Sequence, residues 1–416
     1  MLLYIPAIYF SIILLHICRR QGFSIAACII GLYAIMAILA IPLYTSGYIQ
    51  GKFYPIEFSP LATLIYCLMP TLLAWPFYQF NSNEKRTITC TNTKWLDILS
   101  WTSIGVFIFL AIFLASDIEH VLSMGDAMGA LRGDEDYAAE TAIGSSTGPL
   151  RVVGIICNIL SSVSSVALIL FFYNICFRDT SKILNTLLFL SSTSGVLVGI
   201  VGVDRSSIFF WIIRFVFIYC LFRPYFTGKT KRVVFVAFSV LIGLLIAYLT
   251  VLTMSRFEEN SQQSLLFYFG QSYLMFSTFW NTVQLPETNW GIFHPIITQF
   301  FGSEGSMPVS TVEYGKELAM RVGFFINVFY SFMGSIVIYI GQEYVIPYCI
   351  LYWILTKVFV KTNEQINVYD LLILFVMAQV SLCGVIVYIF TEYAYALGYL
   401  LVFVGSYIAS RFETGK

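Results

Sequence analysis

The sequence predicts an all-α, polytopic integral membrane protein of about eleven transmembrane helices. Hydrophobic residues make up 58% of the 416-residue chain and charged residues only 11%, with a mean hydropathy of +0.81. A typical soluble domain is roughly 45–50% apolar and about 25% charged. Apolar runs of roughly 20 residues, the length that crosses a bilayer as a helix, recur along the chain. The formal net charge of zero offers no basic surface for nucleic acid.

The predicted spans follow one another through the whole chain, so residues 1–416 are interpreted as a single membrane domain. The first run lacks a basic region before it and a small-residue cleavage site after it, so we interpret it as a retained helix and not as a signal peptide. The eleven spans cover residues 2–18, 24–44, 59–80, 97–115, 151–173, 184–203, 206–222, 233–253, 334–358, 368–388 and 393–410.

The basic residues indicate the orientation of these spans. If the segment after the first span is cytoplasmic, fifteen basic residues fall on the cytoplasmic side: Arg19, Arg20, Lys85, Arg86, Lys94, Arg178, Lys182, Arg223, Lys229, Lys231, Arg232, Lys357, Lys361, Arg411 and Lys416. Seven fall outside: Lys52, Arg132, Arg151, Arg205, Arg256, Lys316 and Arg321. This positive-inside bias predicts an outer N-terminus and a cytoplasmic C-terminus.

Two long loops then lie outside, at residues 116–150 and, between the eighth and ninth spans, at 254–332. The aromatic segment 265–283 within the larger loop is apolar enough to be a twelfth span. Counting it as one would place the last four basic residues outside, against the charge rule. We therefore interpret 265–283 as a re-entrant or interfacial segment whose aromatic rings suit headgroups or sugars.

Most of the seven basic residues predicted to lie outside are arginines. A guanidinium can donate two hydrogen bonds to phosphate oxygens, whereas the ammonium of lysine acts as a point charge. Four of these arginines lie at predicted membrane boundaries, the depth of a lipid-linked diphosphate: Arg151, Arg205, Arg256 and Arg321. The alternative is that each one only snorkels to the headgroups.

The stretch "VGIVGVDRSSIFFWIIRF" places Asp204 and Arg205 between two spans and Arg214 within the second. Asp204 either pairs with Arg205 or caps the following helix. Arg205 at a helix N-terminus is suited to bind phosphate. Arg214 lies deeper, where an ionisable residue is a functional candidate or is paired inside the bundle.

A group that orients or deprotonates an attacking hydroxyl would be a histidine or a carboxylate. His294, in "GIFHP", is the preferred candidate for this group. Glu258 and Asp204 are further candidates, and Glu392 is a weaker one. The sequence contains no His/Cys pattern typical of a metal site, so no metal is expected.

Three stretches resemble the bacterial O-antigen and capsule repeat-unit polymerases of the Wzy type. They are "GVDRSSIFF" at 202–210, "FYFGQSYLMFSTFWN" at 267–281 and "NVFYSFMGSIVIYIG" at 327–341. The third stretch departs from the family pattern, because Ser331 replaces an aspartate and the following glycine is displaced to Gly334. This sequence therefore lacks the carboxylate that the family pattern has at this position.

The resemblance implies a glycosyltransferase of the bacterial cytoplasmic membrane that polymerises undecaprenyl-diphosphate-linked oligosaccharide repeat units into lipopolysaccharide or capsule. It implies no cofactor, and a flippase and a chain-length regulator as protein partners. By motif, Arg205 is the first candidate to bind the diphosphate, and Arg321, Arg256 and Arg151 join it by position. Tyr268, Tyr273 and Trp280 are the candidates for contacting sugar.

Two other classes remain open. A flippase or other carrier of lipid-linked oligosaccharide is one, although carriers usually hold more charge within their helices and have shorter loops. An O-antigen ligase or another outer-face transferase is the second. These residues do not separate a ligase from a polymerase, since both handle the same donor diphosphate.

Overall fold

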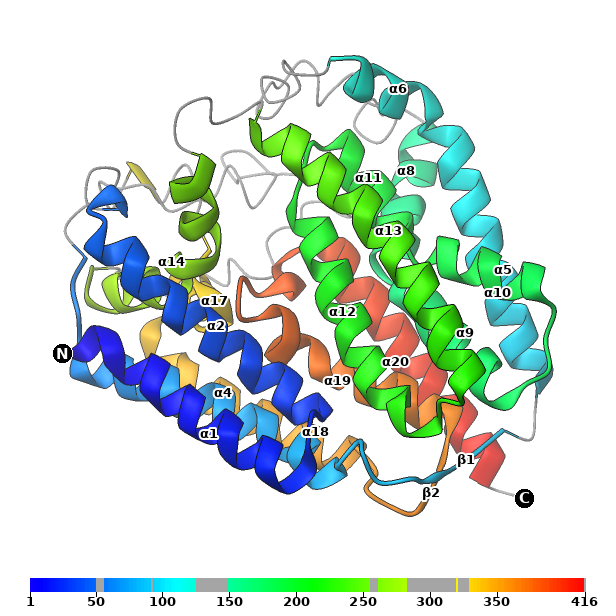
Figure 1. The fold of residues 1–416 in the computed structure, drawn as a ribbon, viewed down its shortest axis with the longest axis horizontal. Helices are drawn as coiled ribbons and strands as arrows, with labels where there is room; N and C mark the ends of the chain where they lie inside the picture. Colours follow the sequence, from blue (N-terminus) through cyan, green and yellow to red (C-terminus); the bar gives the residue numbers. More distant parts are fainter. Residues whose placement is uncertain are drawn as a thin grey trace. The chain divides into compact units, whose positions relative to one another are not determined.

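The computed structural model describes residues 1–49, 56–90, 93–124, 149–254, 261–282, 319–320 and 329–414, and nearly all of these are helical (Figure 1). The predicted all-α class is confirmed. The chain divides into two compact units. Unit 1 comprises Met1–Asn83, Gln262–Thr362 and Leu374–Ala396, and unit 2 comprises Glu84–Ser261, Asn363–Ile373 and Leu397–Lys416.

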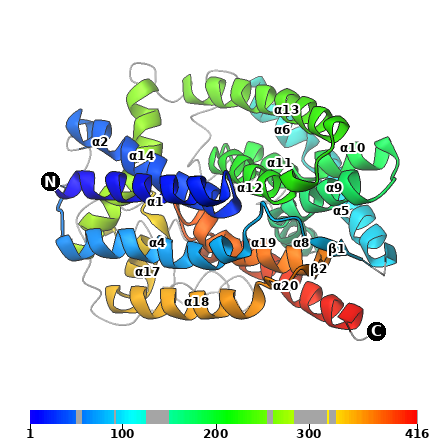
Figure 2. The ribbon, with the colours of Figure 1, turned by 60° about the horizontal axis from the view of Figure 1, so that its bottom comes forward.

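Unit 1 contains a layer of helices in which α2 packs against both α1 and α4, and α18 packs against α4 (Figures 1 and 2). Serine side chains cap α2 and α4: Ser24 accepts from the Ala27 amide and Ser59 from the Ala62 amide, each at 3.3 Å. The helices of this unit are α1 (Ile5–Gln21), α2 (Ile25–Thr45), α4 (Pro60–Phe80), α14 (Ser261–Thr282), α17 (Ser331–Tyr339) and α18 (Val345–Phe359), with 3₁₀ turns η1 (Leu2–Tyr4), η4 (Gln342–Tyr344) and η5 (Ile389–Thr391).

Unit 2 is a second helical bundle with one short parallel strand pair. Its α9 packs against α10 and α12, its α5 against α10 and α8, and its α11 against α12 (Figure 1). The elements are β1 (Thr87–Thr89), α5 (Thr93–Phe113), α6 (Ala115–Ser123), α8 (Pro149–Ser162), α9 (Ser165–Phe177), α10 (Lys182–Ser191), α11 (Ser194–Val201), α12 (Ser206–Phe222), η3 (Arg223–Tyr225), α13 (Gly228–Met254) and β2 (Gln365–Asn367). By residue number, α19 (Val368–Cys383) and α20 (Tyr393–Thr414) each belong partly to both units.

Within the described residues, seven helices are long and apolar enough to cross a membrane, and an eighth span results if one bent helix pair is counted. The seven are Leu2–Gln21, Ile25–Thr45, Pro60–Phe80, Thr93–Phe113, Lys182–Val201, Ser206–Tyr225 and Tyr393–Phe412. Each of them coincides with a predicted span. The chain is therefore a polytopic membrane protein.

Three other predicted spans differ from the structure in continuity. The span expected at 151–173 bends by 45° between α8 and α9. The single helix expected over 334–358 is wrong: α17 and α18 are separated at Gly341, whose φ of 125° lies in a region that favours glycine. The helix expected over 368–388 ends at Cys383. The predicted re-entrant or interfacial segment 265–283 is the helix α14, which is largely buried.

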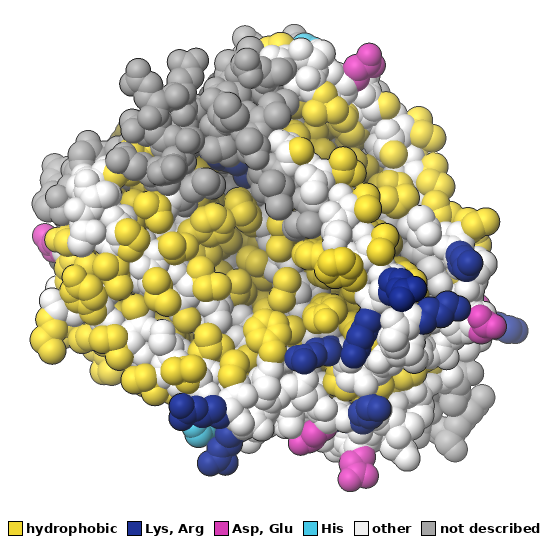
Figure 3. Space-filling view, viewed as in Figure 1, with side chains coloured by type: hydrophobic (Ala, Val, Ile, Leu, Met, Phe, Trp, Pro, Cys, Tyr) yellow, Lys and Arg dark blue, Asp and Glu magenta, His cyan; other side chains and the backbone are white. Residues whose placement is uncertain are grey.

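Large hydrophobic side chains cover much of the surface, as Figure 3 shows for one face. On α1, Ile8, Ile12 and Leu15 are 58–59% exposed, and on α5 Ile112 is 73% exposed. Such a surface would be unfavourable in water but suits the hydrocarbon of a bilayer.

Candidate functional site

Several helix ends of unit 2 meet at one place, which we name the basic end. Arg178 at the end of α9 forms a 2.8 Å ion pair with Asp97 near the start of α5. Tyr225 of η3 contacts the backbone of Arg86, ahead of β1. We include in the basic end the exposed basic side chains at these helix ends of unit 2: Lys94, Lys182, Arg223, Lys229, Lys231, Arg232 and Arg411. Figure 3 shows Lys and Arg side chains gathered over the region of α9, α10 and the start of α13.

Arg86 is the buried cation of this end, with 7% of its surface exposed. Its guanidinium donates to the Asn363 carbonyl (Nε to O, 3.2 Å) and to the Glu84 carboxylate (Nη2 to Oε2, 3.4 Å). Burial lowers the pKa of the Arg86 guanidinium, and the Glu84 carboxylate opposes that shift. Arg86 thus connects the loop before β1 to the loop before β2.

The stretch that links α11 to α12 is the Asp204–Arg205 region, and its turn follows a known helix-ending pattern. The Asp204 amide donates to the Gly199 carbonyl at 2.7 Å, and the Val203 amide donates to the Ile200 carbonyl at 3.0 Å. These two bonds are those of a Schellman motif, which places its C′ residue in the left-handed region. That residue is Val203, with φ 48°.

A β-branched residue rarely adopts this conformation, because its side chain crowds the backbone. Val203 is nonetheless fully buried and packs against Val121, with Ile200, Met124 and Tyr248 around them. The buried contact of the side chain holds a backbone geometry that would otherwise be unfavourable.

Gly199 and Ser207 bring α11 and α12 into close approach. A Cβ at Gly199 would lie 1.9 Å from the Ser207 Oγ and 2.6 Å from its Cβ, so only glycine fits. Ser207 also donates to the Asp204 carbonyl at 3.2 Å. We name the segment Gly199–Ser207 the junction.

The carboxylate of Asp204 binds the first residue of α12. Its Oδ1 accepts from the Ser206 amide at 3.1 Å, and its Oδ2 accepts from the Ser206 hydroxyl. The described hydrogen bonds of this carboxylate go to Ser206, two residues further on, in an Asx-type turn at the start of α12, whose N-cap residue is Arg205. A carboxylate held in this way is a turn-forming group, which leaves its candidate catalytic role as a prediction.

Arg205 and Arg214 are both buried, at 3% and 4% exposure. Arg205 is the N-cap residue of α12, where the helix dipole also favours an anion. Arg214 lies deeper in the same helix, with its guanidinium 5.6 Å from the Phe210 ring and 5.7 Å from the Tyr399 ring of α20. Aromatic faces attract a cation, so these two rings contribute to holding Arg214 inside the bundle.

The helix α12 separates the junction from the basic end. It runs 17 residues from Ser206 to Phe222, a length of about 25 Å at 1.5 Å per residue. The junction and the basic residues therefore lie at opposite ends of one apolar helix. This is the arrangement that the alternating charge pattern predicts for Arg205.

Of the other predicted diphosphate-binding residues, only the backbone of Arg151 is described. Arg151 is the third residue of α8, a helix that packs against α11. Val153, two residues further on, packs against a buried cluster that includes Val201 of the junction. Arg256 and Arg321 lie outside the described residues, as do the candidate catalytic residues His294 and Glu258.

In unit 1, the second and third stretches of the family resemblance pack together. The rings of Tyr268 and Phe329 lie 5.3 Å apart, as do those of Phe279 and Tyr330. Two further hydrogen bonds tie both stretches to the chain after α19: Ser272 donates to the Val385 carbonyl at 2.6 Å and the Ser331 amide to the Ile386 carbonyl at 3.0 Å.

The three aromatic residues predicted to contact sugar differ in exposure. Tyr268 and Trp280 are partly exposed. Tyr273 is fully buried, where its hydroxyl donates to the Leu2 carbonyl at 3.1 Å and shares a 2.8 Å hydrogen bond with Thr63. Tyr273 thus has the environment of a core residue, whereas the other two have surface available.

Ser331, the position at which the sequence resemblance expects an aspartate, has an unusual backbone conformation. It is fully buried with φ 63°, at the start of α17. Aspartate and asparagine adopt this left-handed region more readily than most residues, which gives an aspartate there a structural reason as well as a chemical one. Serine retains the backbone conformation without the charge.

Sequence reasoning missed the residues that shape the junction, namely Gly199, Val203, Ser206 and Ser207. The only local signal was the glycine-rich "GIVGVDRSS" between two apolar runs. Tyr399, a ring partner of Arg214, lies 185 residues away in sequence (399 minus 214) and had no such signal. Comparison of the chain with family models, curated proteins and solved structures gives no match.

Proposed function

We propose that this protein is a glycosyltransferase that polymerises polyprenyl-diphosphate-linked oligosaccharide repeat units at the outer face of a bacterial cytoplasmic membrane. The observation that carries the proposal is Arg205, a buried guanidinium at the N-terminus of α12, at the end of unit 2 remote from the basic residues. The polytopic helical architecture supports it.

The proposed orientation follows from the two ends of unit 2. Basic residues are retained on the cytoplasmic side of membrane proteins, so the basic end is assigned to the cytoplasm and the junction to the outer face. In this orientation the N-terminus is outside and the C-terminus is cytoplasmic.

In the proposed reaction, a hydroxyl of the incoming lipid-linked repeat unit attacks the anomeric carbon of the growing chain. The new glycosidic C–O bond forms as the bond to the polyprenyl diphosphate breaks. The hydroxyl proton passes to a base, for which His294 and Glu258 are the candidates, and the diphosphate departs with the electron pair. Arg205, aided by the dipole of α12, stabilises the charge that develops on this leaving group.

Tyr268 and Trp280 are proposed to stack on sugar rings, since both are partly exposed and Tyr268 packs directly on the third family stretch. A flippase that delivers the repeat units and a chain-length regulator are the proposed partners.

The decisive experiment uses a strain in which the gene is deleted and the surface glycan is resolved on a gel. We expect single capped repeat units in the deletion strain and a full ladder after complementation. Unattached polymer would assign a ligase, and loss of exported repeat units would assign a flippase.

The matched variants are Arg205→Ala and Arg223→Ala, since Arg223 is an exposed arginine at the other end of α12. Loss of one preorganised charge contact reduces turnover by about 100- to 1,000-fold, so Arg205→Ala should give single repeat units. Arg223→Ala should give the normal ladder. Arg205→Lys, which keeps the charge without the fork, should fall between them. An Arg205→Ala protein that is inserted normally and still makes a ladder contradicts the role of Arg205.

A further inference from the structure

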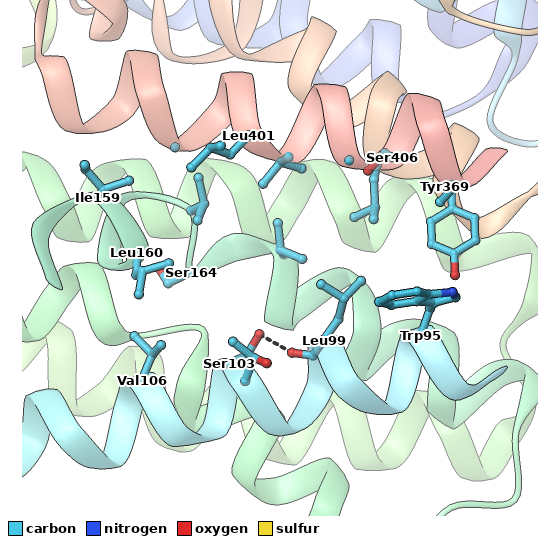
Figure 4. Close-up of a pocket in the computed structure, with 18 of the residues that line it drawn as sticks. Trp95, Leu99, Ser103, Val106, Ile159, Leu160, Ser164, Tyr369, Leu401 and Ser406 are labelled. Atoms are coloured by element: carbon cyan, nitrogen blue, oxygen red, sulfur yellow. Dashed lines mark hydrogen bonds between the residues drawn. The ribbon is translucent and has the colours of Figure 1, made fainter. Parts of the chain in front are cut away.

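Unit 2 contains a cavity of about 810 Å³ between α5, the α8–α9 bend, α19 and α20 (Figure 4). This volume is within the range of small-molecule sites and is several times the roughly 150 Å³ that accommodates one benzene ring. Figure 4 shows Trp95 and Tyr369 facing each other at one end, and Val106, Ile159 and Leu160 toward the other.

Three of the hydroxyls along the wall donate to backbone carbonyls. Ser103 donates to the Leu99 carbonyl at 2.8 Å, Ser191 to the Leu187 carbonyl at 2.7 Å, and Ser194 to the Ser191 carbonyl at 2.8 Å. The hydroxyl hydrogens of these three serines are thus not available to a ligand. Aliphatic side chains such as Leu99, Val106, Val163 and Leu401 also line the cavity. Such a surface is complementary to hydrocarbon.

The cavity also communicates with the outside of the bundle. Leu401 and Phe412 both line it, yet they are 63% and 78% exposed. The two long helices that flank it are candidate spans of low burial, with 22% of the α5 window and 28% of the α20 window inside the protein. In a membrane these helices face lipid, so the medium that reaches the opening is hydrocarbon and not water.

One end of the cavity carries aromatic and basic residues of the kinds found at the depth of the lipid headgroups. Trp95 is 56% exposed at the start of α5, as expected for an aromatic residue at a membrane–water boundary, and the buried ring of Tyr369 faces it. Lys94 precedes Trp95, and Arg411 precedes Phe412; both cations are exposed. Each such residue attracts an anionic lipid surface by about 1 kcal/mol.

We propose that this cavity binds a hydrocarbon chain of an anionic glycerophospholipid, with its headgroup beside Lys94 and Arg411. The chain would run along α5 from Trp95 toward Val106. The headgroup end of this site, at Lys94 and Arg411, lies at the basic end of unit 2, whereas the proposed diphosphate contact, Arg205, lies at the junction. The far end of the cavity, at Val106, packs against the cluster that contains Val201 of the junction. The lipid proposal does not depend on the proposed function, and it assigns the bound lipid to the leaflet that meets the basic residues.

Two glycines allow a matched test in the full-length protein. Gly405 lines the cavity, and a Cβ there would meet nothing within 4 Å, so Gly405→Phe places a ring in the cavity without a backbone clash. Gly105 of α5 also has open space but does not line the cavity, so Gly105→Phe is the control. Both proteins are purified with phosphatidylglycerol, and retained lipid is measured by native mass spectrometry.

We expect the unsubstituted protein and Gly105→Phe to retain phosphatidylglycerol, and Gly405→Phe to retain at least about 10-fold less, which corresponds to about 1.4 kcal/mol of lost affinity. Equal retention by the two variants overturns the proposal. Preferential retention of a polyprenyl phosphate also overturns it, because the cavity would then belong to the glycan carrier.

Two further measurements keep the test decisive. The double variant Lys94→Gln/Arg411→Gln should lower phosphatidylglycerol retention to the level of phosphatidylcholine. If Gly405→Phe does not fold, a diazirine-labelled phosphatidylglycerol is crosslinked to the unsubstituted protein instead. Crosslinks within Leu99–Val106 and Leu401–Phe412 support the site, and crosslinks confined to other helices contradict it.

Discussion

The two ends of unit 2 use charge in different ways. At the basic end, arginines bond to groups that are distant in sequence: Arg178 to Asp97, and Arg86 to the Asn363 carbonyl. At the junction, the acid next to Arg205 bonds instead to its own turn, through Ser206. The guanidiniums of the basic end therefore connect segments of the fold. The carboxylate of the junction shapes a turn that presents Arg205 at the N-terminus of α12.

Burial alone does not distinguish these two arginines, since Arg86 and Arg205 are both buried. Substitutions at the basic end should change stability. Substitutions at the junction should change stability where they alter its packing or its backbone strain.

The largest expected stability effect is at the close approach of the junction. Gly199→Ala gains at most about 1 kcal/mol of helix propensity. It places a methyl group against Ser207, and such overpacking is destabilising by about 1–3 kcal/mol, with the upper value expected for a 1.9 Å approach. The melting temperature in detergent should fall, and the double variant Gly199→Ala/Ser207→Gly should recover most of the loss. No recovery would mean that the α11–α12 contact is not the cause.

Arg86→Ala should lower the free energy of unfolding by about 2 kcal/mol, because hydrogen bonds from a charged group contribute about 1.5–3 kcal/mol and the Asn363 carbonyl loses its donor. Glu84→Ala is the control, since the Glu84 side chain is 63% exposed and its ion pair contributes at most about 1 kcal/mol. Equal melting temperatures of the two variants would show that Arg86 does not hold these loops.

Val203 allows the strained turn to be tested directly. Val203→Ala removes buried methyl groups and keeps a non-glycine residue at φ 48°, whereas Val203→Gly also releases the strain. We expect the glycine variant to be the more stable of the two by about 1 kcal/mol, the reverse of the usual order in helices. An alanine variant with the higher melting temperature would contradict the left-handed conformation.

The smallest effect is expected for the ion pair at the basic end. Asp97→Asn removes the charge that faces Arg178, but Asp97 is 44% exposed, so the change should be below about 0.5 kcal/mol. The melting temperature should respond little to salt. A large loss would mean that this pair is more protected from water than its exposure indicates.

The sequence was sufficient to predict the fold class. Continuous apolar runs long enough to cross a bilayer are compatible with few structures other than transmembrane helices. It also placed Asp204 near a helix cap, because the residue type and the following serines are typical of one. Continuity was less predictable: hydropathy does not distinguish one span from two helices separated by a left-handed glycine, as at Gly341. The environment of Arg214 required a contact with Tyr399, and tertiary contacts of that kind leave no local pattern.

The pairing of β1 with β2 has a consequence for the order in which the protein is made. The Arg86 side chain and the Asn363 carbonyl are separated by 277 residues. β1 and the Arg86 side chain therefore cannot pair with β2 and the Asn363 carbonyl until most of the chain has been synthesised. Contacts of such long sequence separation form late, because the intervening chain must first be ordered. This contact and the β1–β2 pairing can therefore form only after Gln262–Thr362, the later part of unit 1, has been synthesised.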